Sequence, residues 1–449
     1  MKHTMQLSFV ILFFLYLPFM PSSNAEDWPQ WRGPSGNSIS GESGLPVHWS
    51  ETEHIVWKAP LAGLGASSPI IWGDKIFVTS QKGTVPIAQG MRPLLARDDE
   101  DLASRENPIG GRNMKADGSG GAAVLIVEAF RKSDGTRLWE YKTKATGELP
   151  QLNEKHNLAT PTPVTDGKLV YAWFGTGQIL ALDMKGKLVW SRHLGIEISP
   201  FTIPWGHGAS PTLYKDTLIF LCDHPEKSYL LALDKSTGKK RWMVDRGKGR
   251  ISHSTPLVVA GPNGNELIVN SSERIDAYNP GTGELLWYTG SKRQTPVPSP
   301  VFQNGVIYLS RGYRNSNFLA IKPGGHGDIT ADHILWNAPN GASYVPSILY
   351  YKGLLYVTNE VGIVLCADAE TGKPVWRKRL GGIFYASPVA GDGKVYMVSE
   401  TGETYVLAAG REAKLLATND LGERFLASPA ISNSRLFLRS DGTIFCIGD

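Results

Sequence analysis

The chain has 449 residues, of which 41% are hydrophobic and 10% aromatic, and it contains 49 glycines and 29 prolines. This composition excludes a largely disordered chain and favours many short strands that are separated by tight turns. The formal net charge is only +4, with charges of both signs interspersed. A charge balance this weak does not indicate a nucleic-acid partner.

The N-terminus has the pattern of a cleaved export signal. Lys2 precedes an apolar run over residues 7–20, and the small residues Ser23 and Ala25 follow it. This pattern predicts a signal peptide over residues 1–25, cleaved after Ala25. The alternative is an uncleaved anchor, but the run is shorter than the ~20 residues that a membrane-spanning helix needs. No cysteine lies near the cut, so we expect a periplasmic or secreted protein without a lipid anchor or a membrane span.

One sequence pattern recurs along most of the chain. As in residues 163–194, it opens with a small residue and proline, continues through an aromatic strand, and closes with a glycine turn and a tryptophan. Self-similarity at a period of 20 to 50 residues is typical of a solenoid, a propeller or an array. The openings are marked by Pro69, Pro163, Pro211, Pro256, Pro300, Ile348, Pro388 and Pro429. The closing strands carry Trp57, Trp139, Trp190, Trp242, Trp287, Trp336 and Trp376, with Leu416 in the eighth.

The two ends of this array are incomplete in complementary ways. Residues 54–61 match only the closing strand of the repeat, whereas residues 427–447 supply an opening and a middle without a tryptophan strand after them. A chain of this kind can close a ring by pairing its ends, which removes exposed sheet edges. We therefore predict an all-β fold over residues 55–449: an eight-bladed β-propeller of four-stranded antiparallel blades, closed by pairing of the N- and C-terminal strands.

Two segments do not follow the repeat. Residues 26–54 are rich in Gly, Ser and Pro and predict an extended N-terminal arm. Its residues Trp28, Trp31 and Trp49 would be costly to leave in water, so we expect the arm to lie along the flank of the ring. Residues 81–121 form an inserted loop between the second and third strands of the first blade, and a loop this long is usually functional or disordered.

The three cysteines are predicted to be unpaired. Cys366 and Cys446 occupy the repeat position where other blades have Ala181, Ala232, Ala277, Ala320 and Ala408, and Cys222 ends a different strand. We expect all three thiols to act as small buried hydrophobic groups.

The repeat, with its small-Pro opening, its Ala-Leu-Asp turn and its tryptophan, resembles the pyrroloquinoline-quinone (PQQ) type of propeller repeat over about residues 55–449. That superfamily contains the quinoprotein alcohol dehydrogenases and the non-catalytic outer-membrane assembly factor BamB. The phrases WPQWRGP, KHNLATPTP and WGHGAS also resemble exported single-propeller proteins that are common in planctomycetes. The resemblance implies the fold and leaves the activity open, because one fold hosts unrelated functions.

The resemblance gives little support for a cofactor. Quinone dehydrogenases of this superfamily typically hold calcium with acidic and amide side chains, and often carry two adjacent cysteines, which this chain lacks. We therefore expect no cofactor, and PQQ with calcium belongs only to an alternative hypothesis. No HExxH, GxSxG, phosphate-loop or CxxC motif occurs. The sequence GGHGD at 324–328 offers too few oxygen donors for calcium, so we expect no metal site.

A ligand site is expected at the mouth of the central channel, on the face that carries the loops entering the innermost strands. Three residues before the Ser or Thr of the opening, the repeat places aromatic rings at His207, Tyr344, Phe384 and Phe425. Neighbouring candidates are His156, Asn157, Trp205, Arg250, His253, Tyr385 and Arg424. A concave mouth lined by aromatic and a few polar groups is the usual setting of a ligand site. The alternative is that these aromatics simply fill the channel.

Three functions are compatible with these observations. The first is an exported, non-catalytic and monomeric binding or scaffold module for a protein, glycan or small molecule. The second is a PQQ-dependent oxidoreductase. The third is a hydrolase or lyase that uses His207 and His253 as general bases, although no nucleophile or orienting acid lies beside them in sequence.

Overall fold

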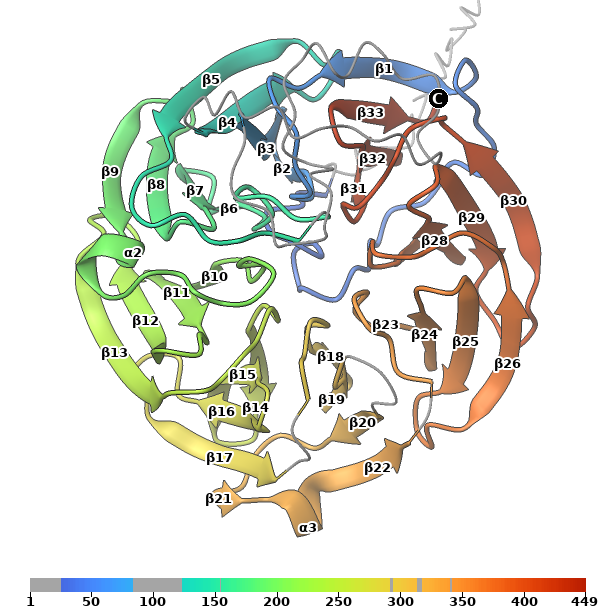
Figure 1. The fold of residues 1–449 in the computed structure, drawn as a ribbon. Coiled ribbons are helices and arrows are strands. Elements are labelled where there is room, and N and C mark those ends of the chain that lie inside the picture. The colour runs from blue at the N-terminus through green and yellow to red at the C-terminus, as the bar shows by residue number, and fades with distance from the viewer. Residues whose placement is uncertain (1–25, 84–122, 154, 291–293, 313–316, 340) are drawn as a thin grey trace, which may run out of the picture.

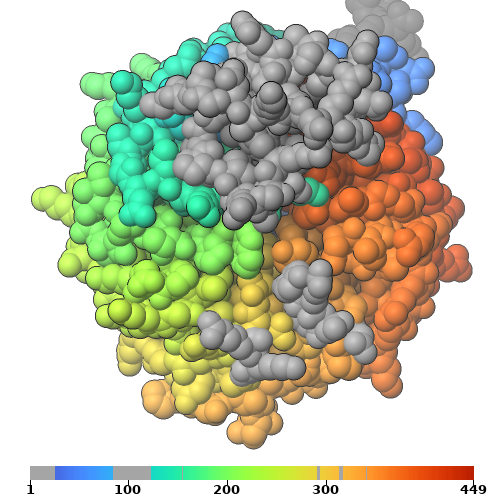
Figure 2. Space-filling model, viewed as in Figure 1, coloured from blue at the N-terminus to red at the C-terminus, as the bar shows by residue number. Residues whose placement is uncertain are grey.

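The computed structural model describes residues 26–83, 123–153, 155–290, 294–312, 317–339 and 341–449. Eight antiparallel sheets stand around a central axis, each with its first strand at the axis and its fourth at the rim (Figure 1). The space-filling view from the same direction shows the blades coloured green to orange packed side by side (Figure 2). The predicted eight-bladed propeller is confirmed.

Each blade runs from an innermost strand at the axis to an outermost strand at the rim. Blades one to four, in that order of strands, are β2 (Ile70–Trp72), β3 (Lys75–Lys82), β4 (Val124–Arg131), β5 (Arg137–Lys144); β6 (Val164–Thr165), β7 (Leu169–Trp173), β8 (Gln178–Asp183), β9 (Leu188–His193); β10 (Thr212–Tyr214), β11 (Thr217–Cys222), β12 (Ser228–Asp234), β13 (Lys240–Gly247); and β14 (Leu257–Gly261), β15 (Gly264–Asn270), β16 (Arg274–Tyr278), β17 (Leu285–Gly290). Blades five to eight are β18 (Val301–Gln303), β19 (Val306–Ser310), β20 (Phe318–Ile321), β22 (Ile334–Ala338); β23 (Leu349–Tyr351), β24 (Leu354–Thr358), β25 (Ile363–Asp368), β26 (Pro374–Arg379); β27 (Val389–Gly391), β28 (Lys394–Val398), β29 (Glu403–Ala408), β30 (Leu415–Asp420); and β31 (Ala430–Ser432), β32 (Arg435–Arg439), β33 (Thr443–Ile447), β1 (Ile55–Pro60).

Within the described ranges, three short elements lie outside the four-stranded pattern. They are β21 (Gly327–Asp328), which pairs in parallel with β17, and the single-turn helices α2 (Leu194–Glu197) and α3 (Thr330–His333). Within the described residues, no helix is both long enough and apolar enough to cross a membrane.

The last blade is completed by the start of the chain. β1 pairs antiparallel with β33, with Trp57 opposite Cys446 and Pro60 opposite Thr443. The blue β1 lies outside the dark red β33, β32 and β31 in Figure 1. The predicted closure by terminal strands is therefore confirmed, and it pairs an edge of β33 that would otherwise be open.

Most of the recurring tryptophans join their blade to the next one, whereas Trp287 donates to Glu266 of its own blade. Trp190 of β9 donates its indole N–H to the carbonyl of Lys235 in the third blade, at 2.9 Å. Its ring lies against Gly238 in the same turn, where a Cβ atom would come within 2.7 Å of the ring. Gly238 also has φ of 69°, a conformation that favours glycine. Equivalent indole contacts are made by Trp57, Trp139, Trp336 and Trp376.

The seventh blade departs from the predicted alignment. In other blades the tryptophan lies opposite the small residue of the third strand, as Trp190 does opposite Ala181. In the seventh blade that pair is Ala417 opposite Val406, so Leu416 and Ala408 were aligned wrongly by one and two residues. The error arose because a β-bulge, which follows Val406, cannot be located without a tryptophan to mark it.

A closed belt of hydrogen bonds explains the small polar residue that opens each repeat. The backbone N–H of each such residue donates to the side-chain hydroxyl of its equivalent in the next blade, at 2.7–3.0 Å. We call this the hydroxyl belt; its members in order are Ser68, Thr162, Ser210, Thr255, Ser299, Ser347, Ser387 and Ser428, and Ser428 donates back to Ser68. The belt ties all eight blades together around the channel.

The N-terminal arm takes a different course from the one predicted. Its first half crosses the centre of the ring, where Trp28 exchanges backbone hydrogen bonds with Ile71 of β2 and Arg32 donates to the carbonyls of Pro300 and Ile348 (Figure 1). Only its second half follows the flank, where Trp49 donates its backbone N–H to the side chain of Asn419 of β30. The flank prediction was wrong for the first half because the innermost strands offer unpaired backbone groups that the arm can satisfy.

Other predicted segments are only partly described. β3 continues through Lys82 and β4 begins at Val124, so residues 81 and 82 belong to the strand and not to the predicted insertion. The rest of that insertion, from residue 84 to 121, lies outside the described residues, as does the predicted signal peptide over residues 1–25.

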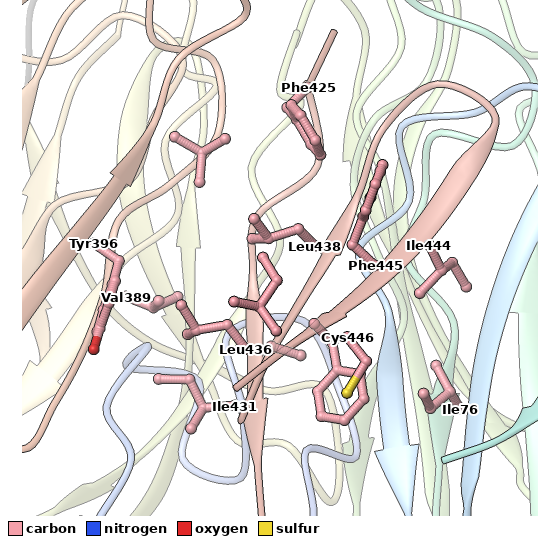
Figure 3. Packing of buried hydrophobic residues seen from close by; sticks show 14 of the residues in the cluster. Ile76, Val389, Tyr396, Phe425, Ile431, Leu436, Leu438, Ile444, Phe445 and Cys446 are labelled. Atoms are coloured by element: carbon pink, nitrogen blue, oxygen red, sulfur yellow. The ribbon is translucent and has the colours of Figure 1, made fainter. Parts of the chain in front are cut away.

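The three cysteines are free and buried, as predicted. Figure 3 shows Cys446 packed among the apolar side chains of the last blade. Burial raises the pKa of the Cys366 thiol and of the Cys446 thiol to about 12, which suppresses the reactive thiolate.

We expect all three thiols to be unreactive toward a thiol reagent in the native protein and to react stoichiometrically after denaturation, as measured by labelling and mass spectrometry. A native-state reaction, or a disulfide recovered under non-reducing conditions, would contradict this burial.

Candidate functional site

In most of the segments that enter the innermost strands, a buried residue is followed directly by a partly exposed one. The residue three positions before each belt hydroxyl is buried in seven of the eight blades. His207, Phe384 and Phe425 are among these buried residues, and they pack between blades. Only Tyr344 of the four predicted mouth residues reaches the channel cavity.

The residues two positions before each belt hydroxyl face the channel instead. All eight are partly exposed, and all eight line one cavity. They are Ala66, Thr160, Gly208, His253, Val297, Val345, Tyr385 and Leu426. The predicted placement at the mouth was therefore wrong for His207, Phe384 and Phe425 by one position, which reverses the direction of the side chain, whereas Tyr344 does line the cavity.

Because one of these two neighbouring residues lies in the core and the other lines the cavity, we expect Phe425→Ala and Leu426→Ala to lower the stability by different amounts. Phe425 points toward Phe445 in the core of the last blade (Figure 3), whereas Leu426 lines the cavity. Phe425→Ala is expected to lower the free energy of unfolding by about 3–5 kcal/mol, because it leaves a cavity in the core. Leu426→Ala is expected to lower it by less than about 1.5 kcal/mol, since its side chain is only half-buried. Denaturant unfolding of both variants tests this, and equal losses would refute the assignment of the two faces.

The mouth cavity is the space enclosed by these eight residues and by further aromatic and polar groups. Its volume is about 410 Å³, within the range of small-ligand sites. Trp31 of the arm lines it, and also lines a smaller cavity of about 210 Å³ between the arm and blades three to five. The arm therefore contributes Trp31 to the walls of both cavities. The other lining residues are Asn153, Lys155, His156, Trp205, Thr295, Tyr344 and six members of the hydroxyl belt.

Lys155 is the one charged residue among those that line the mouth cavity in the described part of the chain. Its ammonium donates to the Tyr385 hydroxyl and to the Glu400 carboxylate, each at 2.8 Å, and lies 4.2 Å from the centre of the Tyr385 ring. Burial would lower the pKa of Lys155, but the hydrogen bonds to Glu400 and Tyr385 hold it above its usual value. The ammonium is thus charged but already neutralised by Glu400.

Two imidazoles of the cavity wall are uncharged at neutral pH. Burial lowers the pKa of His156 to about 3, helped by the nearby His253, and lowers the pKa of His253 to about 4. Nδ1 of His156 lies 3.1 Å from both the Asn157 carbonyl oxygen and the Thr160 hydroxyl oxygen. His156 and His253 therefore act as neutral hydrogen-bonding groups.

Trp205 forms the rim of the cavity and differs from the other tryptophans. It is 45% exposed and is held at φ of 68°, an uncommon conformation for a bulky residue. Its carbonyl accepts a hydrogen bond from the backbone N–H of Asn153, and its ring centre lies 6.5 Å from that of His253. Backbone strain of this kind persists only where the surrounding structure imposes it.

The remaining predicted site residues have structural roles. Asn157 is buried and donates to the Leu64 carbonyl. Arg250 pairs with Asp276 at 3.1 Å, and Arg424 pairs with Asp441 at 2.7 Å. His207 lies beside His224 in an aromatic cluster of blades two and three, and burial lowers its pKa well below the usual value.

The sequence-based prediction missed Trp31, Asn153, Lys155, Thr160 and the hydroxyl belt. The recurrence of Ser or Thr before the opening proline was a usable signal for the belt. Nothing in the sequence signalled Trp31, because its place in the cavity depends on the course of the arm.

The cavity does not fit PQQ and calcium. None of the described residues that line it is a carboxylate, and calcium in proteins is held by several oxygen ligands that usually include carboxylates. PQQ itself is a tricarboxylic acid, whereas the single lining cation is already paired with Glu400. In the described residues, no cluster of three or more His, Cys, Asp or Glu side chains could hold a metal ion.

Comparison with known proteins agrees with the fold. The family model for "Outer membrane protein assembly factor BamB" matches residues 125–378 and 328–415. BamB of Yersinia pestis is 22% identical over 341 residues, covering 71% of this chain and 79% of that protein. BamB of Moranella endobia is 25% identical over 193 residues, covering 42% and 46%.

Solved structures give the same result at lower identity. The crystal structure of BamB from Moraxella catarrhalis has a TM-score of 0.51 at 14% identity, covering 73% of this chain and 94% of that one. Quinohemoprotein alcohol dehydrogenase from Comamonas testosteroni has a TM-score of 0.60 at 12% identity, covering 94% and 80%. These likenesses show a shared fold and do not decide between the functions of the two proteins. The family model matches residues 125 to 415, which is more than half of this chain. The chain therefore belongs to the PQQ-like propeller family described as outer membrane protein assembly factor BamB.

Proposed function

We propose that this chain is an exported, non-catalytic binding module that holds its ligand in the mouth cavity. The observation that carries this proposal is the ring of eight partly exposed residues, one from each blade, around a single cavity of about 410 Å³. Because the hydroxyl belt fixes the blades relative to one another, the cavity is preformed, which lowers the cost of ordering it on binding.

The chemistry of the lining supports binding without catalysis. A histidine that acts as a general base is usually oriented by an acid, but no described residue lining the cavity is a carboxylate. Lys155 is engaged by Glu400 and Tyr385, so it is not an uncharged base or nucleophile. The curated relatives are named assembly factors, which also supports a binding role for this chain.

The test is a thermal-shift and tryptophan-fluorescence screen of sugars, peptides, and small acids and amines against the purified mature chain. We expect hits that are lost in the double variant Trp205→Ala/Tyr385→Ala and kept in Leu335→Ala, which truncates an exposed residue of β22. Hits that survive the double variant, or chemical turnover of a hit, would overturn the proposal.

The oxidoreductase alternative has its own test. After addition of PQQ and calcium, we expect the quinone to leave with the small molecules on gel filtration. Co-elution of one quinone per chain, with substrate-dependent dye reduction, would favour that alternative instead.

A further inference from the structure

The geometry of the mouth cavity points to its ligand class: we infer that it binds an uncharged saccharide, with one sugar ring stacked on Trp205. This inference rests on the proposed function, since it names the ligand of the same cavity. It is carried by three observations: the exposed tryptophan at the rim, the cancelled charge of the lining, and the surplus of hydroxyl groups around the channel.

Trp205 has the exposure expected of a side chain on which a ligand stacks. Tryptophans such as Trp190 and Trp336 use their indole N–H and their ring to dock onto the next blade. Among the described residues Trp205 has neither role, yet its backbone is held in a strained conformation and the residue is 45% exposed, with its ring beside His253. Exposing a large aromatic ring at the cost of backbone strain is explained if the ring meets a ligand with an apolar face.

The charge of the lining favours an uncharged ligand. Among the described lining residues, the positive charge of Lys155 is cancelled by Glu400, and His156 and His253 are neutral. An anion or a cation would lose its hydration on entering this cavity and would gain no free opposite charge in return. A neutral molecule bears no such cost.

The lining offers more hydroxyl groups than the fold itself uses. Six belt members line the cavity: Ser68, Thr162, Ser210, Thr255, Ser387 and Ser428. The oxygen of each accepts a backbone N–H within the belt, but none of the six donates its own O–H to an acceptor in the described residues. Nε2 of His156 likewise has no partner in the described part of the chain.

These groups match the two sides of a sugar ring. The C–H face of a pyranose is apolar and can stack on an indole, while its edge carries hydroxyls that both donate and accept hydrogen bonds. A peptide is a poorer match, because the described lining residues offer no free charge for a terminus. The aromatic rings of Tyr344 and Tyr385, which also line the cavity, add apolar surface for a second ring.

The experiment is a titration of the purified mature chain with four neutral disaccharides: maltose, cellobiose, lactose and N,N′-diacetylchitobiose. Digalacturonate, the chitosan dimer and a neutral tetrapeptide provide the acidic, basic and peptide arms. Binding is read by saturation-transfer NMR and by tryptophan fluorescence. We expect at least one neutral disaccharide to bind, and to bind more tightly than either charged disaccharide.

Three variants locate the site. Trp205→Ala is expected to weaken that binding at least tenfold, Trp205→Phe to restore part of it, and Leu335→Ala to leave it unchanged. Because Trp205 is 45% exposed, the melting temperature of Trp205→Ala is expected to stay close to that of the wild type, so lost binding is not lost folding.

The outcomes separate this inference from the proposed function. If only a charged disaccharide or the peptide binds, and the Trp205→Ala/Tyr385→Ala variant loses it, the saccharide inference fails and the binding function stands. If a neutral disaccharide binds equally well to Trp205→Ala, the inference also fails. If no compound of any class binds the wild type, both proposals fail together.

Discussion

Deletion of residues 26–61 is expected to abolish cooperative folding. The deletion removes β1 and so exposes the whole edge of β33, which becomes free to pair with other chains. It also removes the buried rings of Trp28, Trp49 and Trp57. Each buried aromatic is worth about 3–5 kcal/mol, so their sum approaches the 5–15 kcal/mol of stability that a typical domain has.

Circular dichroism during heating, with size-exclusion chromatography, measures this result. We expect aggregates or a broad transition from the deletion variant and an unchanged transition from Lys58→Ala, which truncates an exposed residue of β1. A peptide of residues 26–61, added in trans during refolding, should restore part of the cooperative transition. A deletion variant that is monomeric and melts like the wild type would contradict closure of the ring by β1.

Substitution of Arg246 by Ala is expected to cost at least about 3–5 kcal/mol, the second largest effect. Arg246 of β13 is buried between blades three and four, where its guanidinium contacts Asp223 at 2.7 Å and Asp276 at 2.9 Å, as well as the hydroxyl of Tyr278. Burial alone would raise the pKa of Asp223, but the charge of Arg246 holds it below its usual value. Removing the guanidinium leaves the buried carboxylate of Asp223 without its main partner, whereas Asp276 keeps Arg250 and Arg274.

A residue on the same strand provides the control. Arg241 pairs with Asp234 at the exposed end of β13, and such surface pairs contribute about 0–1 kcal/mol. Arg241→Ala should therefore unfold nearly as the wild type in guanidinium chloride. In the Arg246→Ala background, Asp223→Asn should recover part of the lost stability, because it removes the buried negative charge that has lost its partner. Equal losses for Arg241→Ala and Arg246→Ala would show that the buried cluster does not hold the two blades together.

Blade number and closure could be predicted because the same marker residues recur from blade to blade. The proline of the opening, the glycine of the Gly238 type of turn and the tryptophan that packs on it all serve local contacts, so they recur at each blade. Where one of these marks is missing, as at Ala417, the alignment slipped although the strand was still recognised.

The site was harder to predict because it depends on side-chain direction in segments without a strand pattern. Phe384 and Tyr385 are adjacent aromatic residues, yet one is core and the other lines the cavity. Adjacent aromatics in an irregular segment offer no reason to prefer one direction. Five predicted residues do line the cavity: His156, Trp205, His253, Tyr344 and Tyr385. The course of the arm, which brings Trp31 into the cavity, is set by backbone hydrogen bonds and by Arg32, whose carbonyl partners on Pro300 and Ile348 lie far away in the sequence.

The most direct test of the mouth cavity is the rate at which a cysteine placed at Leu426 reacts with a thiol reagent in the native protein. Because Cys222, Cys366 and Cys446 are buried, the new thiol is the only one expected to react. We predict that Leu426→Cys is labelled in the native protein, whereas Phe425→Cys is labelled only after denaturation. Rapid native labelling of Phe425→Cys with protection of Leu426→Cys would contradict the proposed lining, and with it the ligand site.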